Sequence, residues 1–186
     1  MKVGIAGYGV VGKTRHRSIE SNTSYQVTAI SECNEEAQKF IPAGLEVYND
    51  YKSLIASADI DVIFISLPNQ FASEAACLSC QRGLHVFCEK PPARTHAELL
   101  EVEKQSLKFP ELKLMYGFNH RFHLSVEEAK LLIDSNSLGR LINMKGVYGK
   151  SQMISFNQTD WRTNREASGG GILLDQGIHM LDLMRY

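Results

Sequence analysis

A glycine-rich segment near the N-terminus has the spacing of a phosphate-binding turn. The pattern G-x-G-x-x-G is formed by Gly7, Gly9 and Gly12, after an apolar run and before a helix-like segment. In such a turn the first glycine permits a tight bend, the second lets the backbone approach a pyrophosphate, and the third allows close packing of helix on strand. Backbone N–H groups near Val10 and Val11 would bind the pyrophosphate. The segment therefore predicts a dinucleotide site, with a tight turn that binds nothing as the alternative.

An acidic residue follows where such a site needs one. Glu32 lies about 20 residues beyond Gly12, at the end of a β-rich segment. Its carboxylate would accept hydrogen bonds from the ribose hydroxyls of adenosine, and its charge would repel a 2′-phosphate. The pattern favours NAD over NADP.

Two further groups of side chains could carry proton chemistry. Lys90 stands in the sequence E-K-P at the end of a predicted strand, the edge where open parallel sheets bind ligands. Asp175, His179 and Asp182 are spaced i, i+4 and i+7, so they share one face of a predicted helix. Taken alone, the lysine could be a solvated surface charge and the Asp–His pair a structural or metal-binding pair. Metal is the weaker alternative, because no third nitrogen or sulfur ligand lies nearby in the sequence.

Strand-like and helix-like segments alternate through the first 117 residues. Strands are predicted at 2–6, 25–31, 47–48, 61–67, 84–88 and 112–116. Helices are predicted at 10–20, 35–40, 51–57, 73–82 and 96–107. Asp50 and Thr95 are placed to cap the third and fifth helices, and Gly83 to end the fourth. Such alternation implies parallel strands with right-handed crossovers, so residues 1–117 are predicted to form a doubly wound α/β (Rossmann) domain.

The pattern changes after Gly117. A capping box at 125–128 predicts a helix to about Ser135, and residues 141–153 predict a long strand. Residues 155–168 are polar and predict a loop, and three glycines precede a helix over 172–185. Residues 118–186 are therefore expected to form part of a second domain.

Composition and charge exclude several classes of protein. The 20 basic and 21 acidic side chains give a net charge of −1, which argues against a nucleic-acid or anionic-membrane partner. The apolar runs are far shorter than the ~20 residues of a membrane helix, and Met1 leads directly into a strand, with no room for a signal peptide. The cysteines, which show no regular framework, are Cys33, Cys77, Cys80 and Cys88. Cys77 and Cys80 are better explained as packed helix residues than as zinc or redox groups. A soluble, cytoplasmic protein is expected.

Four motifs occur in a characteristic order along the chain. They are the glycine turn at 7–12, E-K-P at 89–91, Y-G-F-N-H-R-F at 116–122 and G-G-G-I-L-L-D-Q-G-I-H at 169–179. Together they resemble the glucose–fructose oxidoreductase, inositol dehydrogenase and rhizopine-catabolism (Gfo/Idh/MocA) family of NAD(P)-dependent oxidoreductases. The glycine turn is shared with many folds, but its combination with the other motifs is specific. The resemblance covers essentially all 186 residues.

The resemblance implies a role for each matching position. It implies a catalytic trio of Lys90, Asp175 and His179 and no metal ion. The residues that would border NAD are Gly7, Gly9, Val10, Val11, Gly12, Glu32, Leu67, Pro68, Asn69, Glu89 and Lys90. The residues that would contact substrate are Lys90, Asn119, Arg121, Trp161, Arg162, Asp175 and His179. Family members commonly carry a histidine shortly after the Pro-Asn pair, where this chain has Ala72.

The implied reaction is reversible hydride transfer between a secondary alcohol carbon and the nicotinamide. The substrate would be a sugar, cyclitol or sugar nucleotide. His179 would accept the hydroxyl proton, Lys90 would stabilise the developing alkoxide and Asp175 would hold the hydroxyl. In an alternative mechanism, Lys90 is the acid/base and His179 only orients. The rival functions are a non-catalytic NAD(P)-binding regulator and a fragment that binds NAD and does nothing more.

Family members are also considerably longer, because their second domain is an open sheet that continues past the catalytic helix. This chain stops at or just after that helix, so we expect a truncated second domain that leaves Leu174, Ile178 and Leu181 without a covering sheet. A polypeptide of this length is expected to bind NAD, to turn over poorly, and to form homo-oligomers or leave its last ~70 residues labile.

Overall fold

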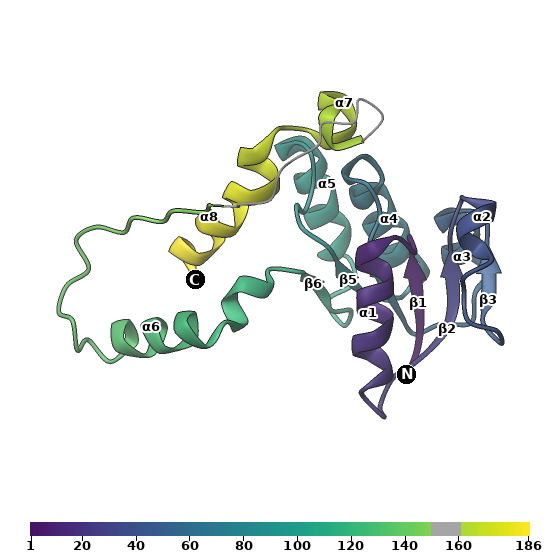
Figure 1. Cartoon of the computed structure of the whole chain (residues 1–186), viewed down its shortest axis with the longest axis horizontal. Helices are drawn as coiled ribbons and strands as arrows, with labels where there is room; N and C mark the ends of the chain where they lie inside the picture. Colours follow the sequence, from purple (N-terminus) through teal and green to yellow (C-terminus); the bar gives the residue numbers. More distant parts are fainter. Residues whose placement is uncertain (150–160) are drawn as a thin grey trace.

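A six-stranded parallel sheet forms the centre of the molecule (Figure 1). The computed structural model describes residues 1–149 and 161–186. The sheet has the order β3-β2-β1-β4-β5-β6, which is the order of a Rossmann fold. Its strands are β1 (Lys2–Ala6), β2 (Gln26–Ser31), β3 (Glu46–Tyr48), β4 (Val62–Ile65), β5 (His85–Cys88) and β6 (Leu114–Tyr116). The predicted doubly wound domain is confirmed, with every predicted strand of the first 117 residues present.

Helices follow the strands in alternation and continue into the second part of the chain. Those of the first part are α1 (Val10–Glu20), α2 (Glu35–Gln38), α3 (Tyr51–Ser57), α4 (Asn69–Arg82) and α5 (His96–Ser106). Those of the second part are α6 (Leu124–Asp134), α7 (Arg165–Ser168) and α8 (Ile178–Arg185). Short 3₁₀ helices occupy Asn119–Phe122 and Trp161–Thr163, and a π-helical turn, Leu173–Gly177, leads into α8.

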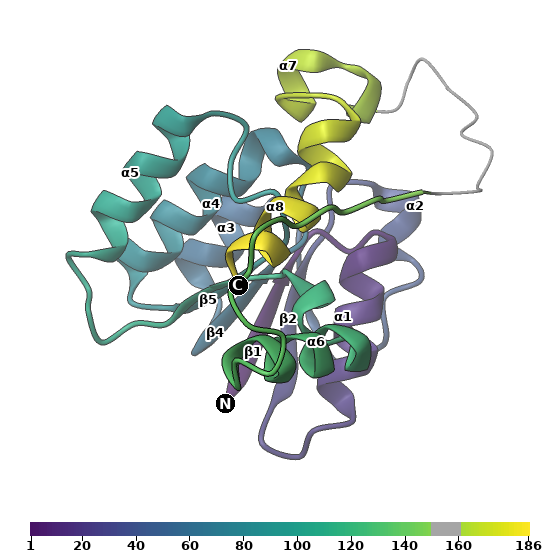
Figure 2. The same cartoon turned by 90° about the vertical axis from the view of Figure 1, so that its left-hand side faces the viewer.

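The sheet is covered on both faces (Figure 2). Ile63 of β4 packs in the larger apolar cluster with Leu54 of α3 and Val102 of α5. Ile5 of β1 packs in the second cluster with Ile19 of α1. Successive strand residues point to opposite faces, and strands that are covered on both faces are apolar at nearly every position. This explains why apolar runs were sufficient to locate the strands.

The local signals that start and stop helices act as expected in the first part. The side chain of Asp50 accepts a hydrogen bond from the Ser53 backbone N–H at 2.8 Å, and Thr95 accepts one from that of Glu98 at 3.2 Å. Gly83 ends α4 with φ of +84°, a conformation that costs glycine little. Helix α4 begins at Asn69, earlier than predicted, directly after Pro68. A proline can stand at this position because the first N–H groups of a helix have no partner within the helix.

Three predictions for the second part of the chain are wrong in the described residues. Ser125 does not cap α6, which begins at Leu124 after His123 and has no side-chain cap. Residues 141–149 form no strand; the remainder of the predicted strand, 150–153, lies outside the described residues. A strand needs neighbours to pair with, and the described residues of this part supply none. Residues 161–168 form helical turns rather than the predicted loop, and 155–160 also lie outside the described residues.

Helix α8 lies over the carboxyl-terminal edge of the sheet, and α6 lies to one side of it (Figures 1 and 2). The segment 141–149 returns from α6 and passes close to α8, because a Cβ on Gly146 would lie 3.0 Å from Met180. Large apolar side chains stay exposed here, among them Ile142 at 93% and Leu173 at 74%. No helix in the described residues is long and apolar enough to cross a membrane.

We predict that Leu54→Ala will lower the free energy of unfolding by about 2–5 kcal/mol, since it removes a fully buried side chain and leaves a cavity. Urea denaturation followed by circular dichroism measures the change. The matched control is Leu131→Ala, whose parent side chain is 64% exposed and should contribute less than about 1 kcal/mol. Equal losses for the two variants would contradict the assignment of the core.

Candidate functional site

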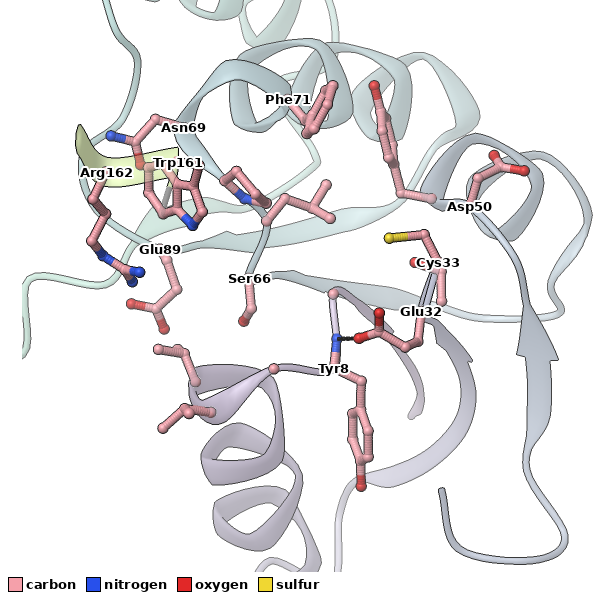
Figure 3. Close-up of a pocket in the computed structure, with 18 of the residues that line it drawn as sticks. Tyr8, Glu32, Cys33, Asp50, Ser66, Asn69, Phe71, Glu89, Trp161 and Arg162 are labelled. Carbon is pink, nitrogen blue, oxygen red and sulfur yellow. Dashed lines mark hydrogen bonds between the residues drawn. The ribbon is translucent and has the colours of Figure 1, made fainter. Parts of the chain in front are cut away.

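A cavity of about 590 Å³ opens at the carboxyl ends of the strands (Figure 3). Its walls come from the glycine turn after β1, from the segments that follow β2, β4 and β5, and from the second part of the chain. Glu32 and Cys33 lie at one end, and Trp161 and Arg162 lie at the other. Parallel α/β sheets bind ligands at this edge, beside the point where strand order reverses.

The glycine turn is shaped for close approach by a ligand. Gly7 has φ of +87°, and a Cβ on Gly12 would come within 2.1 Å of the Gly7 carbonyl oxygen, so neither position accepts a side chain without movement. At Gly9, the residue before α1, a Cβ would meet nothing within 4 Å. That open space adjoins the first N–H groups of α1, which have no side-chain cap. The turn therefore fits the pyrophosphate of a dinucleotide.

Glu32 is held in place beside this turn. Its carboxylate accepts a hydrogen bond from the backbone N–H of Tyr8 at 3.3 Å (Figure 3). It also accepts one from the backbone N–H of Asn34 at 2.9 Å. Among the described lining residues, the basic side chains are Lys90 and Arg162, and Arg162 lies at the opposite end of the cavity. A negative charge with fixed acceptor oxygens fits a ribose diol better than a 2′-phosphate.

Glu89 lines the cavity but is already paired. Its carboxylate accepts a hydrogen bond from Nε of Arg15 at 2.5 Å, and the Arg15 guanidinium lies 5.0 Å from the centre of the Phe87 ring. The positive charge of Arg15 is therefore directed at Glu89.

Lys90 and Asp175 meet at the wall of the cavity. Lys90 follows β5, and its Nζ donates hydrogen bonds to the main-chain oxygen of Asp175 at 2.7 Å and to its Oδ1 at 2.8 Å. The peptide bond that follows Lys90 is cis. Burial by itself would raise the pKa of Asp175, but the hydrogen bond and charge of Lys90 outweigh it and hold that pKa below its usual value. The lysine ammonium and the aspartate carboxylate therefore face the cavity as an ion pair.

The π-helical turn brings Asp175 to this position. Such single turns occur frequently at functional sites. Asp175 lies in the middle of the turn, and His179 lies one turn further on, in the first residues of α8. The expected closeness of Asp175 and Lys90, which are 85 residues apart in the sequence, is present in the structure.

His179 is enclosed behind this pair and does not line the cavity. Its side chain is buried, with 4% exposed, and its Nδ1 has no hydrogen-bond partner among the described residues. Burial lowers the pKa of His179 to about 4, helped by the charges of His120 and Lys90. The imidazole is therefore uncharged at neutral pH. Since Nδ1 is sealed, a bound molecule can exchange a proton only with Nε2.

Several predicted contact residues have protein partners in the structure. The Asn69 side-chain amide donates to the main-chain oxygen of Ser168 at 2.8 Å, and the Arg121 guanidinium forms a two-point ion pair with Asp182. Asn119 is exposed and does not line the cavity. Of the other predicted positions, the cavity is lined by Gly7, Gly9, Val10, Val11, Leu67, Pro68, Asn69, Trp161 and Arg162.

A set of contacts outside the predicted site holds the second part of the chain in place. Nη1 of Arg94 donates to the main-chain oxygen of Glu166 at 2.5 Å, and its other guanidinium nitrogens bond Glu98. A Cβ on Gly169 would come within 2.4 Å of Arg94, so glycine is needed where the two segments touch. No sequence motif marked Arg94, because its partner in α7 is distant in the chain. His120, which stacks on His179, lies within the motif at 116–122 but was given no role of its own.

No group of three or more side chains in the described residues could hold a metal ion. The groups available for chemistry are therefore side chains: the ion pair of Lys90 with Asp175 at the cavity wall, and the uncharged His179 one helical turn beyond Asp175.

Comparison with known proteins gives two family matches and several alignments that cover the whole of this chain. Residues 1–117 match a family described as an oxidoreductase family with an NAD-binding Rossmann fold, and residues 126–186 match the C-terminal domain of the same group. Levoglucosan dehydrogenase of Pseudarthrobacter phenanthrenivorans is 30% identical to the chain, covering 100% of the chain and 50% of the relative. The structure of myo-inositol 2-dehydrogenase from Lactobacillus plantarum superposes with a TM-score of 0.84 at 28% identity, over 100% of this chain and 55% of that one.

A further solved structure contains ligands. Scyllo-inositol dehydrogenase from Lactobacillus casei, with bound NAD(H) and scyllo-inositol, has a TM-score of 0.83 and 28% identity over 100% of this chain and 55% of that one. The chain spans about half the length of the relatives that it matches.

We predict a specific pH dependence of stability from His179. Folded His179 binds a proton near pH 4, whereas the unfolded chain binds it near 6.5, so the unfolded state holds more protons between these values. The free energy of unfolding should therefore fall as the pH is lowered from 6.5 toward 4, and His179→Gln should remove this part of the fall. Asp175 affects the free energy of unfolding at lower pH than His179 does, because its pKa is lowered from 3.8.

Urea denaturation at a series of pH values measures the effect. His96→Gln, at an exposed histidine, is the control and should leave the pH dependence unchanged. An unchanged acid sensitivity in His179→Gln would show that His179 is not buried in its neutral form.

Proposed function

The chain belongs to the Gfo/Idh/MocA family of NAD-binding oxidoreductases, and on that basis we propose that it transfers hydride reversibly between a secondary hydroxyl carbon of a sugar or cyclitol and NAD. One observation carries the proposal: the ion pair of Lys90 with Asp175 lines the same cavity as the glycine turn and Glu32. The substrate class is supported by relatives that are named as a levoglucosan dehydrogenase and a scyllo-inositol dehydrogenase.

The residues of the cavity divide into two tasks. The glycine turn and α1 would hold the pyrophosphate, and Glu32 would accept hydrogen bonds from the adenosine ribose. NAD, when bound, supplies the hydride acceptor at its nicotinamide ring. The remaining residues bind and orient the alcohol and manage its proton. We place this second task at Lys90 and Asp175 of the cavity wall and at His179, which is buried one helical turn beyond Asp175, with Trp161 and Arg162 on the substrate side.

The proton must leave the hydroxyl as hydride leaves the carbon. His179 is uncharged at neutral pH, so its imidazole can accept a proton, and Nε2 would be the accepting atom because Nδ1 is sealed. The Lys90 ammonium would donate a hydrogen bond to the same oxygen and stabilise its developing negative charge. Asp175 fixes the direction of that ammonium through the bond at 2.8 Å. The low pKa of His179 makes it a weak base, so Lys90 as the acid/base is the alternative that the experiment must separate.

We further propose a division of labour at residue 117, with residues 1–117 binding NAD and residues 118–186 contributing to the substrate side. The proposal includes a cytoplasmic location and a homo-oligomer. The free thiols of all four cysteines are compatible with a reducing compartment. The exposed apolar side chains of the second part, such as Ile142, are compatible with burial between subunits.

The experiment that tests the reaction compares Lys90→Ala and His179→Ala. Each should lower kcat for oxidation of a cyclitol or hexose by about 10²-fold or more, because each removes a group that acts on the developing alkoxide. NADH formation by the full chain measures turnover, and fluorescence titration measures NAD affinity, which should change little in His179→Ala. Lys113→Ala, at an exposed lysine, is the control.

The outcomes separate the alternatives. Loss of turnover in Lys90→Ala alone would assign the acid/base role to Lys90. Near-normal turnover in both variants would contradict the proposed roles of Lys90 and His179. NAD binding without oxidation of any sugar or cyclitol would contradict the proposed reaction for this chain and favour a binding-only regulator or a fragment that binds NAD and does nothing more.

We also predict the choice of cofactor. NAD should bind more tightly than NADP, because the carboxylate of Glu32 attracts the ribose hydroxyls and repels a 2′-phosphate. Glu32→Ser should narrow the difference by about tenfold or more, an effect on the order of 1.4 kcal/mol. Titration of each variant with both cofactors measures it, with Glu35→Ser, at an exposed glutamate of α2, as the control. Equal affinity of the unmodified protein for both cofactors would refute this role of Glu32.

A further inference from the structure

His120 lies face to face with His179. The ring centres are 3.9 Å apart and the ring planes differ by 12°. Tyr148 lies beside this pair, with its ring centre 5.5 Å from that of His120 and 6.4 Å from that of His179, and its plane is within 15° of both. Phe118 lies perpendicular to His179, with ring centres 6.2 Å apart. One face of the His179 ring is therefore covered by His120, and aromatic side chains from the segments on either side of α6 lie next to it.

An ion pair fixes the two segments that carry the stacked rings. Arg121, the neighbour of His120, binds Asp182, which lies one helical turn beyond His179. Nε of Arg121 is 2.8 Å from Oδ2 of Asp182, and a second guanidinium nitrogen bonds Oδ1. The guanidinium–carboxylate contact has a fixed planar geometry. The 3₁₀ helix that carries His120 is thus held against α8, and His179 cannot tilt without displacing His120.

The geometry of the stack excludes a proton relay between the two histidines. Ring N–H groups and nitrogen lone pairs lie in the plane of an imidazole, so parallel rings present π faces to each other and cannot hydrogen-bond. His120 can therefore act on His179 by contact, by exclusion of water and by charge. Two imidazolium rings at this distance would repel each other, which opposes protonation of either.

The other charged and titratable groups near His179 are mostly compensated. Lys90, from the segment after β5, opposes a positive charge on His179 but is bound to Asp175. Asp175 and Asp182 favour such a charge, yet Asp182 is bound to Arg121. Tyr148, from the segment 141–149, stacks at 6.4 Å from His179. Burial of the ring is the largest influence on its pKa, and His120 contributes to that burial by covering one face.

We propose that His120 is a positioning residue that fixes the plane of the His179 imidazole and keeps that ring uncharged until substrate delivers its proton. The inference rests on the proposed function for the importance of His179, but its physical content does not depend on turnover. An aromatic ring at position 120 is sufficient for it, because the contact uses the face of the ring and not its nitrogens.

The test is an NMR titration of the histidine ring signals in the full chain. The signal of His179 is assigned by its absence in His179→Gln. His120→Ala should raise the pKa of His179 from about 4 toward 6.5, by about one unit or more, because water gains access to the ring. His120→Phe should keep the pKa low, since it restores the covering face. His96→Ala, at an exposed histidine, is the control, and circular dichroism verifies that each variant is folded.

Enzyme kinetics supply the second measurement. His120→Ala should lower kcat by about tenfold with little change in KM, because the proton acceptor is no longer held in its orientation. It should also move the acid limb of the pH–rate profile to higher pH, because the pKa of His179 rises. His120→Phe should reverse most of both changes.

Two results would overturn the inference. One is an unchanged His179 pKa in His120→Ala. The other is an equal rise in His120→Phe and His120→Ala, which would show that the nitrogens of His120 matter and its face does not. The titration could give the expected shifts while neither the unmodified chain nor any variant oxidises a sugar or cyclitol. In that case the positioning role stands and the proposed function fails.

Discussion

The ion pair of Lys90 with Asp175 joins the two parts of the chain at the point where chemistry is expected. Its side chains are only partly exposed, 18% and 37%, and such a pair is stable only when both charges have partners. Lys90 satisfies this by bonding both the carboxylate and the main-chain oxygen of Asp175. The position of Lys90 depends on β5, and that of Asp175 depends on the π-helical turn before α8. Displacing either element would leave one charge unpaired beside the cavity.

The second part of the chain reaches this position through contacts that have no chemical role. Arg94 joins the segment after β5 to α7, and Asn69 at the start of α4 holds the main chain of Ser168. Gly169 follows directly, with φ of +80°, and permits the close approach to Arg94. These contacts fix the start of the segment that leads to Asp175. Asn69 therefore has two roles: it lines the cavity, and its side-chain amide binds the last residue of α7.

The sequence predicts what depends on local pattern, and fails where a structure depends on distant partners. The strands of the first part were predictable, because coverage on both faces makes each strand apolar, and the caps at Asp50 and Thr95 act within a few residues. The i, i+4 spacing of Asp175 and His179 likewise predicted that they share a helix face, but their closeness to Lys90 was implied only by the resemblance to the family. In contrast, residues 141–149 have the composition of a strand but no partner in the described residues. The stacking of His120 on His179 joins residues of two separate segments, so the motif at 116–122 could not show that His120 lies against His179.

The charge balance around His179 explains why burial dominates its protonation. Two carboxylates share its helix face, which would ordinarily raise the pKa of a histidine. Asp175 is bound to Lys90 and Asp182 to Arg121, so a positive charge beside each carboxylate weakens its effect on the imidazole. With both carboxylates paired, burial of the ring outweighs them, and the ring stays neutral. A proton accepted by His179 would therefore be held weakly and released readily. That suits a reversible reaction, in which the same ring must return the proton when hydride moves in the opposite direction.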